Sequence, residues 1–261
     1  MPLGGLKSLA SLLTALPLGG GSLDEAARSF YLVPLLALAV GAASASPSAL
    51  AVEAGVGYIA GGAVYTLAYI LLTGGIHMDG LADYSDVLGS RASGGEALRI
   101  LKDPRKGAFA ALALSLAIAL SIVFPGEVLR LSSPGAFIIL AASSHSGAAA
   151  SMYMLLAAGP PEPYRGMARA FSLEARGRVA LFAATSTASA TASSAALALY
   201  GYPWWLVPLQ WLSSLATGVW VLRSARSTLG YVNGDVAGFC FEASRIASIV
   251  ATALALGVAG V

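Results

Sequence analysis

Charged residues are scarce in this 261-residue chain: Asp, Glu, Lys and Arg together make up 11%, against roughly a quarter in soluble domains. Cysteine occurs once, at Cys240, which excludes an intrachain disulfide and any multi-cysteine metal site. The formal net charge of +2 is too small to indicate a nucleic-acid partner. Apolar residues, in contrast, make up 57% of the chain, and the mean hydropathy is +0.77. The composition therefore predicts a protein embedded in the lipid bilayer through spans of about 20 residues.

Seven apolar segments are long enough to be membrane helices. They are approximately Phe30–Ala45, Leu50–Leu72, Ala108–Phe124, Ala136–Ala158, Val179–Tyr200, Trp204–Leu222 and Phe239–Val261. A shorter segment, Leu6–Leu16, places its leucines on one helical face before Pro17; it indicates an interfacial helix, with a signal peptide as the alternative. The predicted fold is all-α: a polytopic membrane bundle of about seven transmembrane helices plus a short N-terminal interfacial helix, in one domain over residues 1–261.

Positive charge is distributed unevenly among the loops that seven spans would leave. Fourteen of the 15 Lys and Arg residues fall on one side, and only Arg130 falls on the other. This asymmetry is the one that the positive-inside rule describes. It predicts a multi-pass cell-membrane protein whose N-terminus and three long loops, Gly74–Gly107, Gly159–Arg178 and Arg223–Asp235, face the cytoplasm. The active site is expected on that cytoplasmic side.

The segment "GGIHMDGLADYSD" (Gly74–Asp86) concentrates acid directly after an apolar span. Asp79, Asp83 and Asp86 are spaced i, i+4, i+7, which puts them within roughly 60° of one another on a helix. Like charges in this arrangement repel, so a cation is expected beside them. Oxygen-only ligands predict Mg²⁺ rather than zinc, with waters and substrate phosphates completing its shell. The alternative is a solvated helix end whose acids pair with Arg and Lys. His77 would lie about 160° from this face on a helix, outside the ligand set.

A basic segment follows, "ILKDPRKGAF" (Ile100–Phe109), in which Lys102, Arg105 and Lys106 flank Asp103. Cations beside a carboxylate cluster can bind phosphate oxygens while a metal neutralises the remaining charge. By position they are also anchors on the positive side of the membrane, and the two roles are compatible.

A third motif, "GDVAGFCFE" (Gly234–Glu242), lies at the start of the last span. Asp235 and Glu242 are seven residues apart and therefore share a helical face. Either they contribute to a second metal position or they pair with nearby basic residues. The candidates for such pairing are Arg223, Arg226 and Arg245. His145, inside the fourth span, is an intramembrane ionisable group and so a functional candidate; the alternative is a neutral histidine hydrogen-bonded between helices.

Together these motifs resemble the cobalamin synthase family, the adenosylcobinamide-GDP ribazoletransferases. The family pattern is close to His-Leu-Asp-Gly-Leu-Ala-Asp-x-x-Asp-Gly, then Lys-Asp-x-x-x-Gly, then Gly-Asp-x-x-Gly-x-x-x-Glu. The matching residues are His77, Asp79, Gly80, Leu81, Ala82, Asp83, Asp86, Lys102, Asp103, Gly107, Gly234, Asp235, Gly238 and Glu242. The chain departs from the pattern at Val87, where the family usually has Gly, and in the fourth span, where "SSHSGAAASM" replaces a Ser-Arg-Trp-like element.

The resemblance implies a reaction. The cobinamide-phosphate part of adenosylcobinamide-GDP is transferred to the 5′-hydroxyl of α-ribazole, or to its 5′-phosphate form, with Mg²⁺ as cofactor and GMP as leaving group. Such phosphoryl transfer depends mainly on charge neutralisation and positioning. The implied metal ligands are Asp79, Asp83, Asp86 and Glu242. The implied catalytic residues are Asp83 or Asp235 as base, Lys102 and Arg105 as cations, and Asp103. Further candidates are His77, Gly80, Lys106, Gly107 and Gly234.

Three other functions compete with this prediction. The motif of membrane alcohol phosphotransferases also begins with Asp-Gly, but it continues with Ala-Arg, a distant Gly and two further Asp. Here Asp79–Asp83 reads Asp-Gly-Leu-Ala-Asp, and no such downstream set follows. A membrane prenyltransferase would need two separated Asp-rich motifs. A secondary transporter would bind substrate near the bilayer midplane between repeated halves. The chain has no internal repeat, and its acids gather at one membrane face, which favours an enzyme.

Overall fold

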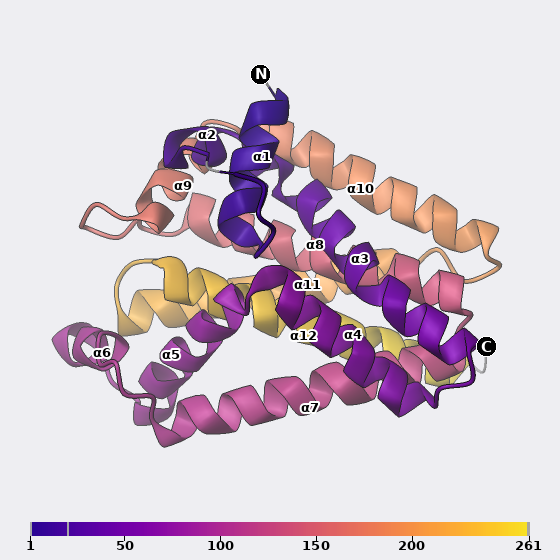
Figure 1. Cartoon of the computed structure of the whole chain (residues 1–261). Coiled ribbons are helices and arrows are strands. Elements are labelled where there is room, and N and C mark those ends of the chain that lie inside the picture. Colours follow the sequence, from indigo (N-terminus) through magenta and orange to yellow (C-terminus); the bar gives the residue numbers. More distant parts are fainter. Residues whose placement is uncertain (1, 20, 260–261) are drawn as a thin grey trace.

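The computed structural model describes residues 2–19 and 21–259, and in this part the chain forms twelve α-helices and one short 3₁₀ helix (Figure 1). The predicted all-α fold class is confirmed at this level. The helices are α1 (Pro2–Leu13), α2 (Leu23–Arg28), η1 (Phe30–Leu32), α3 (Val33–Glu53), α4 (Tyr58–Thr73), α5 (Ile76–Ser90), α6 (Gly94–Leu101), α7 (Ala108–Leu131), α8 (Pro134–Ala158), α9 (Met167–Arg176), α10 (Val179–Leu199), α11 (Leu206–Thr228) and α12 (Gly234–Ala259).

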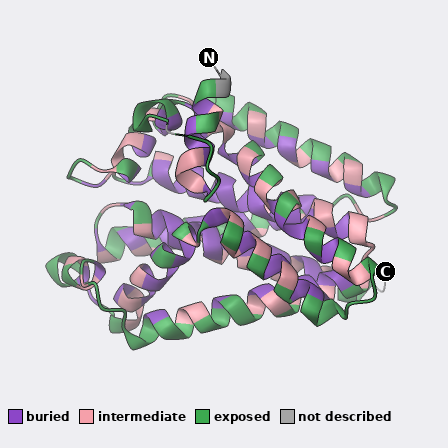
Figure 2. Cartoon of the chain, in the orientation of Figure 1, coloured by how far each residue is buried: buried purple, intermediate pink, exposed green. Residues whose placement is uncertain are grey.

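Helix α8 is the centre of the bundle. It packs against α3, α11 and α12, with α10 on a further side, while α7 packs against α4, α5 and α12. Figure 2 shows buried residues concentrated along the inner helices, and exposed residues on the outer faces of α7 and α10. The buried face of α8 carries small and polar side chains, among them Ser144, His145 and Ser151. Small interior residues allow helices to approach closely.

The outward faces are apolar. Helix α7 exposes Leu112, Leu116, Ile118 and Val123, and α11 exposes Leu212. Large apolar surfaces of this kind do not occur on ordinary soluble monomers and indicate contact with a membrane. The inversion, polar groups inside and leucines outside, is the one expected when lipid rather than water surrounds the bundle.

By length and hydropathy, three helical stretches of the described chain could cross a membrane: Phe30–Glu53, Ala108–Leu131 and Gly234–Ala259. A fourth is possible if α4 and α5, bent by 96° at their junction, count as one span. Each of the seven predicted segments forms a helix, but several are less apolar than a typical span. The reason lies in residues such as His145 and Gln210, which lower the hydropathy of α8 and α11 yet are buried within the bundle.

Several predicted boundaries were wrong. The first segment continues to Glu53, because a proline inside a helix, here Pro47, removes one hydrogen bond without ending the helix. The second begins at Tyr58 rather than Leu50, after a turn in which Gly55 has φ +92°. Helices α7, α11 and α12 also run several residues beyond the predicted bounds. The last two residues of the final predicted segment, 260–261, lie outside the described residues.

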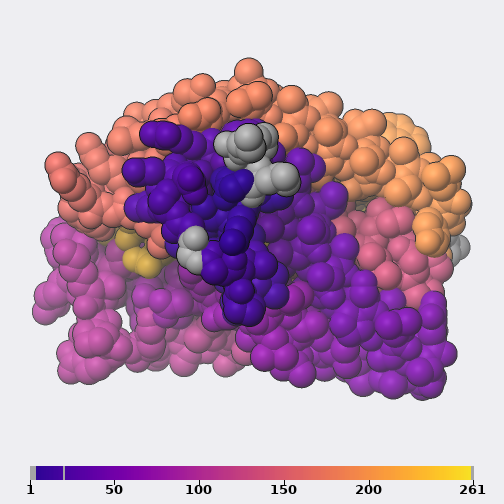
Figure 3. Space-filling model, turned by 45° about the horizontal axis from the view of Figure 1, so that its top comes forward, coloured from indigo at the N-terminus to yellow at the C-terminus, as the bar shows by residue number. Residues whose placement is uncertain are grey.

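The short helices gather at one end of the molecule. Figure 1 shows α2, α6 and α9 at the left, with the turns α3–α4, α7–α8 and α10–α11 at the opposite end. The N-terminal segment, indigo in Figure 3, lies against this bundle rather than apart from it. Leu9 of α1 is fully buried, and the Ala15 amide donates to the Leu72 carbonyl of α4 at 2.8 Å. The three loops predicted to share one membrane side therefore lie at the same end as α1, α2 and α9.

Candidate active site

Helix α5 carries the acidic motif, and two glycines determine its direction. Gly74 and Gly75 have φ of +63° and +69°, the left-handed region, where a residue with a side chain pays roughly 1–2 kcal/mol. Two such residues in succession end α4 and start α5 at an angle of 96°. The motif therefore lies on a separate helix, which runs from the middle of the bundle towards the end where α6 lies (Figure 1).

Asp79 and Asp83 share one cation. The Lys106 ammonium donates to Asp79 Oδ1 at 2.9 Å and also to Asp83 Oδ1. Partial burial by itself would lower the pKa of Lys106, but the hydrogen bonds to Asp83 and Asp79 outweigh it and raise that pKa. The repulsion expected between the two carboxylates is thus relieved by the lysine. Asp83 is the more enclosed of the pair, with 16% of its side chain exposed against 67% for Asp79.

Asp86 has a different partner. Its two carboxylate oxygens accept the amides of Gly107 at 2.6 Å and Ala110 at 2.8 Å, at the start of α7. These amides have no partner within their own helix, and the positive end of the helix dipole favours a carboxylate there. A Cβ at position 107 would lie 2.6 Å from Asp86 Oδ1, so glycine is required for this contact. Asp86 and Gly107 therefore fix α7 onto α5.

Asp103 and Arg105 form an exposed bidentate pair. Arg105 Nε and Nη2 donate to Asp103 at 3.0 and 2.8 Å, and the Arg105 amide adds a third bond. These hydrogen bonds lower the pKa of Asp103 to about 2. Lys102 extends elsewhere: its ammonium lies 5.4 Å from the centre of the Tyr164 ring, in the loop between α8 and α9.

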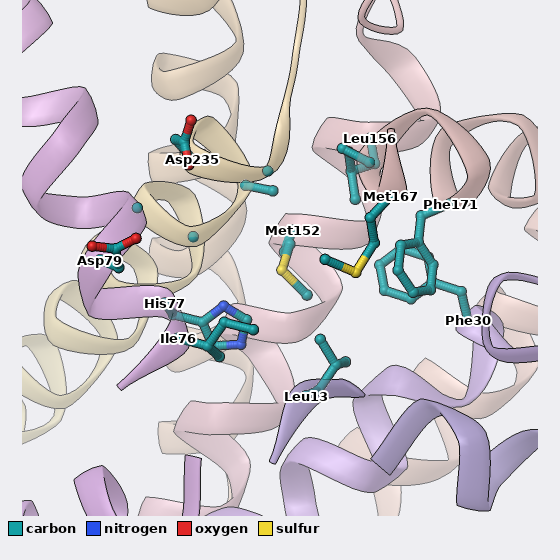
Figure 4. Close-up of a pocket in the computed structure, with 15 residues that line it drawn as sticks. Leu13, Phe30, Ile76, His77, Asp79, Met152, Leu156, Met167, Phe171 and Asp235 are labelled. Carbon is teal, nitrogen blue, oxygen red and sulfur yellow. The ribbon is translucent and has the colours of Figure 1, made fainter. Parts of the chain in front are cut away.

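Helices α5 and α12 cross with their backbones in contact. A Cβ added to Gly80 would lie 2.7 Å from the carbonyl oxygen of Asp235 and 3.1 Å from Gly238 Cα. This contact brings Asp235 into the same cavity wall as Asp79 (Figure 4). Asn233 holds Asp235 in place, since its Nδ2 donates to Asp235 Oδ2 at 2.9 Å. Gly234, also in that wall, has open space around it.

Glu242 lies away from this cluster, inside the bundle. Of the two alternatives for this residue, the structure has the ion pair: Arg245 donates to Glu242 Oε2 at 2.8 and 3.1 Å, and the Tyr69 hydroxyl donates to Oε1. Arg245 also donates to Ser121 at 2.8 Å. Glu242 and Arg245 are 0% and 1% exposed, so this pair links α12 to α4 and α7.

The two histidines are both buried. His77 stacks on Phe241 with ring centres 4.4 Å apart, and its ring borders the cavity that Asp79 and Asp235 line. His145 lies deeper, with Nδ1 2.9 Å from the Ala141 carbonyl of its own helix. The Tyr65 hydroxyl of α4 lies 3.5 Å from the same nitrogen, so the contact between helices that was considered for His145 is present beside the one within α8.

Among the residues that the structure describes, no three His, Cys, Asp or Glu side chains are arranged to hold a metal ion. The carboxylates of Asp79 and Asp83 do bind a cation together, the ammonium of Lys106. Sequence reasoning ranked Lys106 below Lys102 and Arg105, because nothing in "KDPRKG" indicates which of the three cations turns back onto α5. It also missed the cavity, whose walls come from six separate helical segments.

A model of the CobS family, described as cobalamin-5-phosphate synthase, matches residues 5–253. The chain belongs to this family. Its relatives include proteins named adenosylcobinamide-GDP ribazoletransferase from three organisms. That of Chlorobium chlorochromatii is 34% identical over 97% of both chains, and that of Pyrobaculum aerophilum is 31% identical over 94% of both. The relative from Thiobacillus denitrificans is 30% identical over 98% of this chain and 97% of its own. No solved structure matches this member of the CobS family significantly.

Proposed function

We propose that Asp79, Asp83 and Asp235, with the cations of the Lys102–Lys106 loop, form the active site of this adenosylcobinamide-GDP ribazoletransferase. The activity follows from CobS family membership and from near full-length relatives of that name. The family implies adenosylcobinamide-GDP and α-ribazole as substrates. One observation supports this position for the site: two carboxylates hold an ammonium beside a third acid, at the end of the molecule where the cationic loops gather.

In the reaction, a ribose hydroxyl oxygen of the acceptor attacks the phosphorus that carries cobinamide. A new P–O bond forms, the bond to the GMP phosphate breaks, and the hydroxyl proton passes to a base. If the acceptor already carries a 5′-phosphate, as the description of the family indicates, its 5′-oxygen is esterified and another ribose hydroxyl attacks. Asp83 and Asp235 are the candidates for the base. Asp235 is the less engaged, because its side chain accepts from Asn233 and forms no ion pair among the described residues.

Mg²⁺ is the proposed cofactor, held by Asp79 and Asp83. The donors are oxygens, and their position already attracts a cation, Lys106. Mg²⁺ takes one or two carboxylates and completes its shell with waters and substrate phosphates, so two ligands suffice. The predicted ligands Asp86 and Glu242 are engaged by two amides and by Arg245, respectively. When bound, the ion would neutralise charge on the diphosphate.

The cations of the loop have separate roles in this proposal. Lys102 and Arg105 balance the non-bridging phosphate oxygens, for which the planar guanidinium of Arg105 has the better geometry. The Arg105 side chain is 87% exposed, so it can leave Asp103 and bind a phosphate without any rearrangement of the surrounding fold. Before substrate binds, Asp103 orients the guanidinium through two hydrogen bonds and the loop backbone through a third, from the Arg105 amide.

The membrane arrangement proposed is one domain of seven spans. Helices α3, α4, α7, α8, α10, α11 and α12 alternate in direction between the two ends of the bundle (Figure 1). The end that carries α6, α9 and the basic loops faces the cytoplasm, because positive loops are retained there. The diphosphate substrate then reaches the acids from the cytoplasm.

The test is turnover without a membrane gradient. Purified protein in detergent, given adenosylcobinamide-GDP, α-ribazole and Mg²⁺, should release GMP and form adenosylcobalamin in equal amounts. Transport requires two compartments, whereas phosphoryl transfer does not. Folded protein that binds both substrates but releases no GMP would favour the transporter instead.

A further inference from the structure

A cavity of about 190 Å³, open on one side, lies beside the acids and is lined by α1, η1, α5, α8, α9 and α12. Its polar side chains are confined to one side. Figure 4 shows the carboxylates of Asp79 and Asp235 on that side and the rings of Phe30 and Phe171 opposite, with His77 nearer the acids. Leucine and methionine side chains complete the apolar wall. The cavity thus has one polar edge and one apolar end.

The volume limits what can occupy this cavity. Pockets that enclose a whole drug-sized ligand measure roughly 300–1,000 Å³. At about 190 Å³ the cavity is too small for a corrin or a complete nucleotide, and suits one bicyclic ring system. The two substrates offer two such rings, guanine and the dimethylbenzimidazole of α-ribazole.

Polarity separates these two rings. Guanine carries donors and acceptors around most of its edge, and each would lose hydrogen bonds on entering an apolar wall. Dimethylbenzimidazole has both nitrogens on one ring, one bonded to ribose and one free, and only carbon on the other ring. Its nitrogen-bearing edge matches the side of His77, Asp79 and Asp235, and its methyl groups match the end formed by Phe30 and Phe171.

His77 supplies the hydrogen-bonding group that this orientation needs. It is 8% exposed and stacked on Phe241, and within the described parts of the chain its ring makes no hydrogen bond. Its nitrogens are not among the fully buried unpaired atoms of those parts, and the residue lines the cavity, so the ring can bond a ligand from the cavity side. A ligand with one free ring nitrogen would satisfy it.

We infer that this cavity binds the benzimidazole base of α-ribazole, with His77 hydrogen-bonded to its free ring nitrogen. The ribose then extends towards Asp79 and Asp235, where its hydroxyl meets the phosphorus. The inference rests on the proposed function, since it assigns one substrate of that reaction to a subsite. His77 is a base-binding residue here, and α9 supplies the part of the wall that limits the size of the base.

Ala168→Leu tests the size limit, because Ala168 lines the cavity on α9 and is 6% exposed. The added carbons should weaken equilibrium binding of α-ribazole at least tenfold and raise its KM, leaving the KM for adenosylcobinamide-GDP unchanged. The affinity of the Ala168→Leu variant for the riboside of unmethylated benzimidazole should fall less than threefold. Ala170→Leu, on the same helix but outside the cavity lining, is the matched control. If Ala168→Leu does not fold, Met167→Ala is measured in its place. Met167 is an exposed residue of the cavity lining, so removing its side chain should widen the cavity without unfolding the protein and weaken α-ribazole binding severalfold.

His77→Phe tests the hydrogen bond while keeping the ring that stacks on Phe241. Binding of α-ribazole should weaken about tenfold, whereas a dimethylindole riboside, which lacks the free nitrogen, should bind wild type and variant equally. Wild-type protein that releases no GMP would refute the proposed function itself. Active wild type in which Ala168→Leu alters the KM of adenosylcobinamide-GDP alone would overturn the inference, as would a lipid chain in the cavity that α-ribazole does not displace.

Discussion

The three aspartates of α5 share a residue type and a helical face but have different partners. Asp79 and Asp83 bind the Lys106 ammonium, whereas Asp86 accepts two backbone amides from α7. A carboxylate that shares a mobile cation can exchange it for another cation. One that holds the start of a helix stabilises the fold. Substitutions at Asp83 and Asp86 should therefore have different consequences.

Asp83→Asn should abolish most of the activity and leave the fold intact. The amide keeps the shape but removes the charge that binds Mg²⁺, so GMP release should fall by several orders of magnitude. Thermal melting without Mg²⁺ should be unchanged, and the stabilisation that Mg²⁺ gives the wild type should be much reduced. Glu96→Gln, at an exposed pair with Arg99 on α6, is the control and should behave as wild type. An Asp83→Asn variant with near-native turnover would reduce the cluster to a solvated helix end.

Asp86→Asn should show the reverse pattern. One side-chain oxygen can replace only one of the two amide contacts, so the variant should lose about 1 kcal/mol or more of stability, as when a helix cap is removed. Turnover per folded molecule should fall far less than in Asp83→Asn. Melting curves and GMP release measured on the same preparations distinguish the two cases. Full stability combined with lost activity would make Asp86 a metal ligand instead.

Lys106→Met should change the response to Mg²⁺. The ammonium and the metal compete for the same oxygens of Asp79 and Asp83, so removing the lysine should lower the Mg²⁺ concentration for half-maximal activity severalfold. Without Mg²⁺, no cation would offset the repulsion between the two carboxylates of the variant, so its melting temperature should fall. Lys7→Met, on α1, is the matched control. An unchanged Mg²⁺ requirement would separate Lys106 from the metal position.

At the scale of elements, the crossing of α5 and α12 brings Asp79 and Asp235 together. Gly80→Ala inserts a Cβ 2.7 Å from the Asp235 carbonyl oxygen, so the helices must separate. Gly95→Ala, in α6, has no atom within 4 Å of its Cβ and serves as the control. Both substitutions gain about 1 kcal/mol in helix propensity. Gly80→Ala should nevertheless lose stability and at least tenfold in activity, while Gly95→Ala should be neutral or slightly stabilised. Equal behaviour of the two variants in melts and assays would show that the crossing tolerates a methyl group.

At the scale of the whole molecule, charge predicts orientation. In a Cys240→Ala background, Ser93→Cys and Ser227→Cys place exposed thiols at the end with the basic loops, and Ala54→Cys places one at the opposite end. An impermeant maleimide added to intact cells should label the Ala54 variant only. The Ser93 and Ser227 variants should react after the cytoplasmic side is opened. Labelling of either serine variant from outside would reverse the proposed orientation.

The approximate positions of the seven long helices α3, α4, α7, α8, α10, α11 and α12 were predictable because their determinant is local. A stretch of apolar residues forms a helix in the membrane whatever surrounds it, since every backbone group must be paired within the segment. The spacing of Asp79, Asp83 and Asp86 likewise determined that they share a face once the segment is helical. Motif order and spacing sufficed to indicate the family that the comparison later confirmed.

Tertiary structure alone decided which partners those residues have. Glu242 lies only seven residues after Asp235 in the same motif, yet it pairs with Arg245 because α12 passes through the interior at that point. Lys106, rather than Lys102 or Arg105, reaches Asp79 and Asp83 because the 96° turn at Gly74 and Gly75 brings α5 beside the start of α7. The cavity exists only because six separate helical segments come together around it. Helix formation depends on neighbours in sequence, whereas contacts between side chains depend on how the finished helices pack, and no local pattern encodes that arrangement.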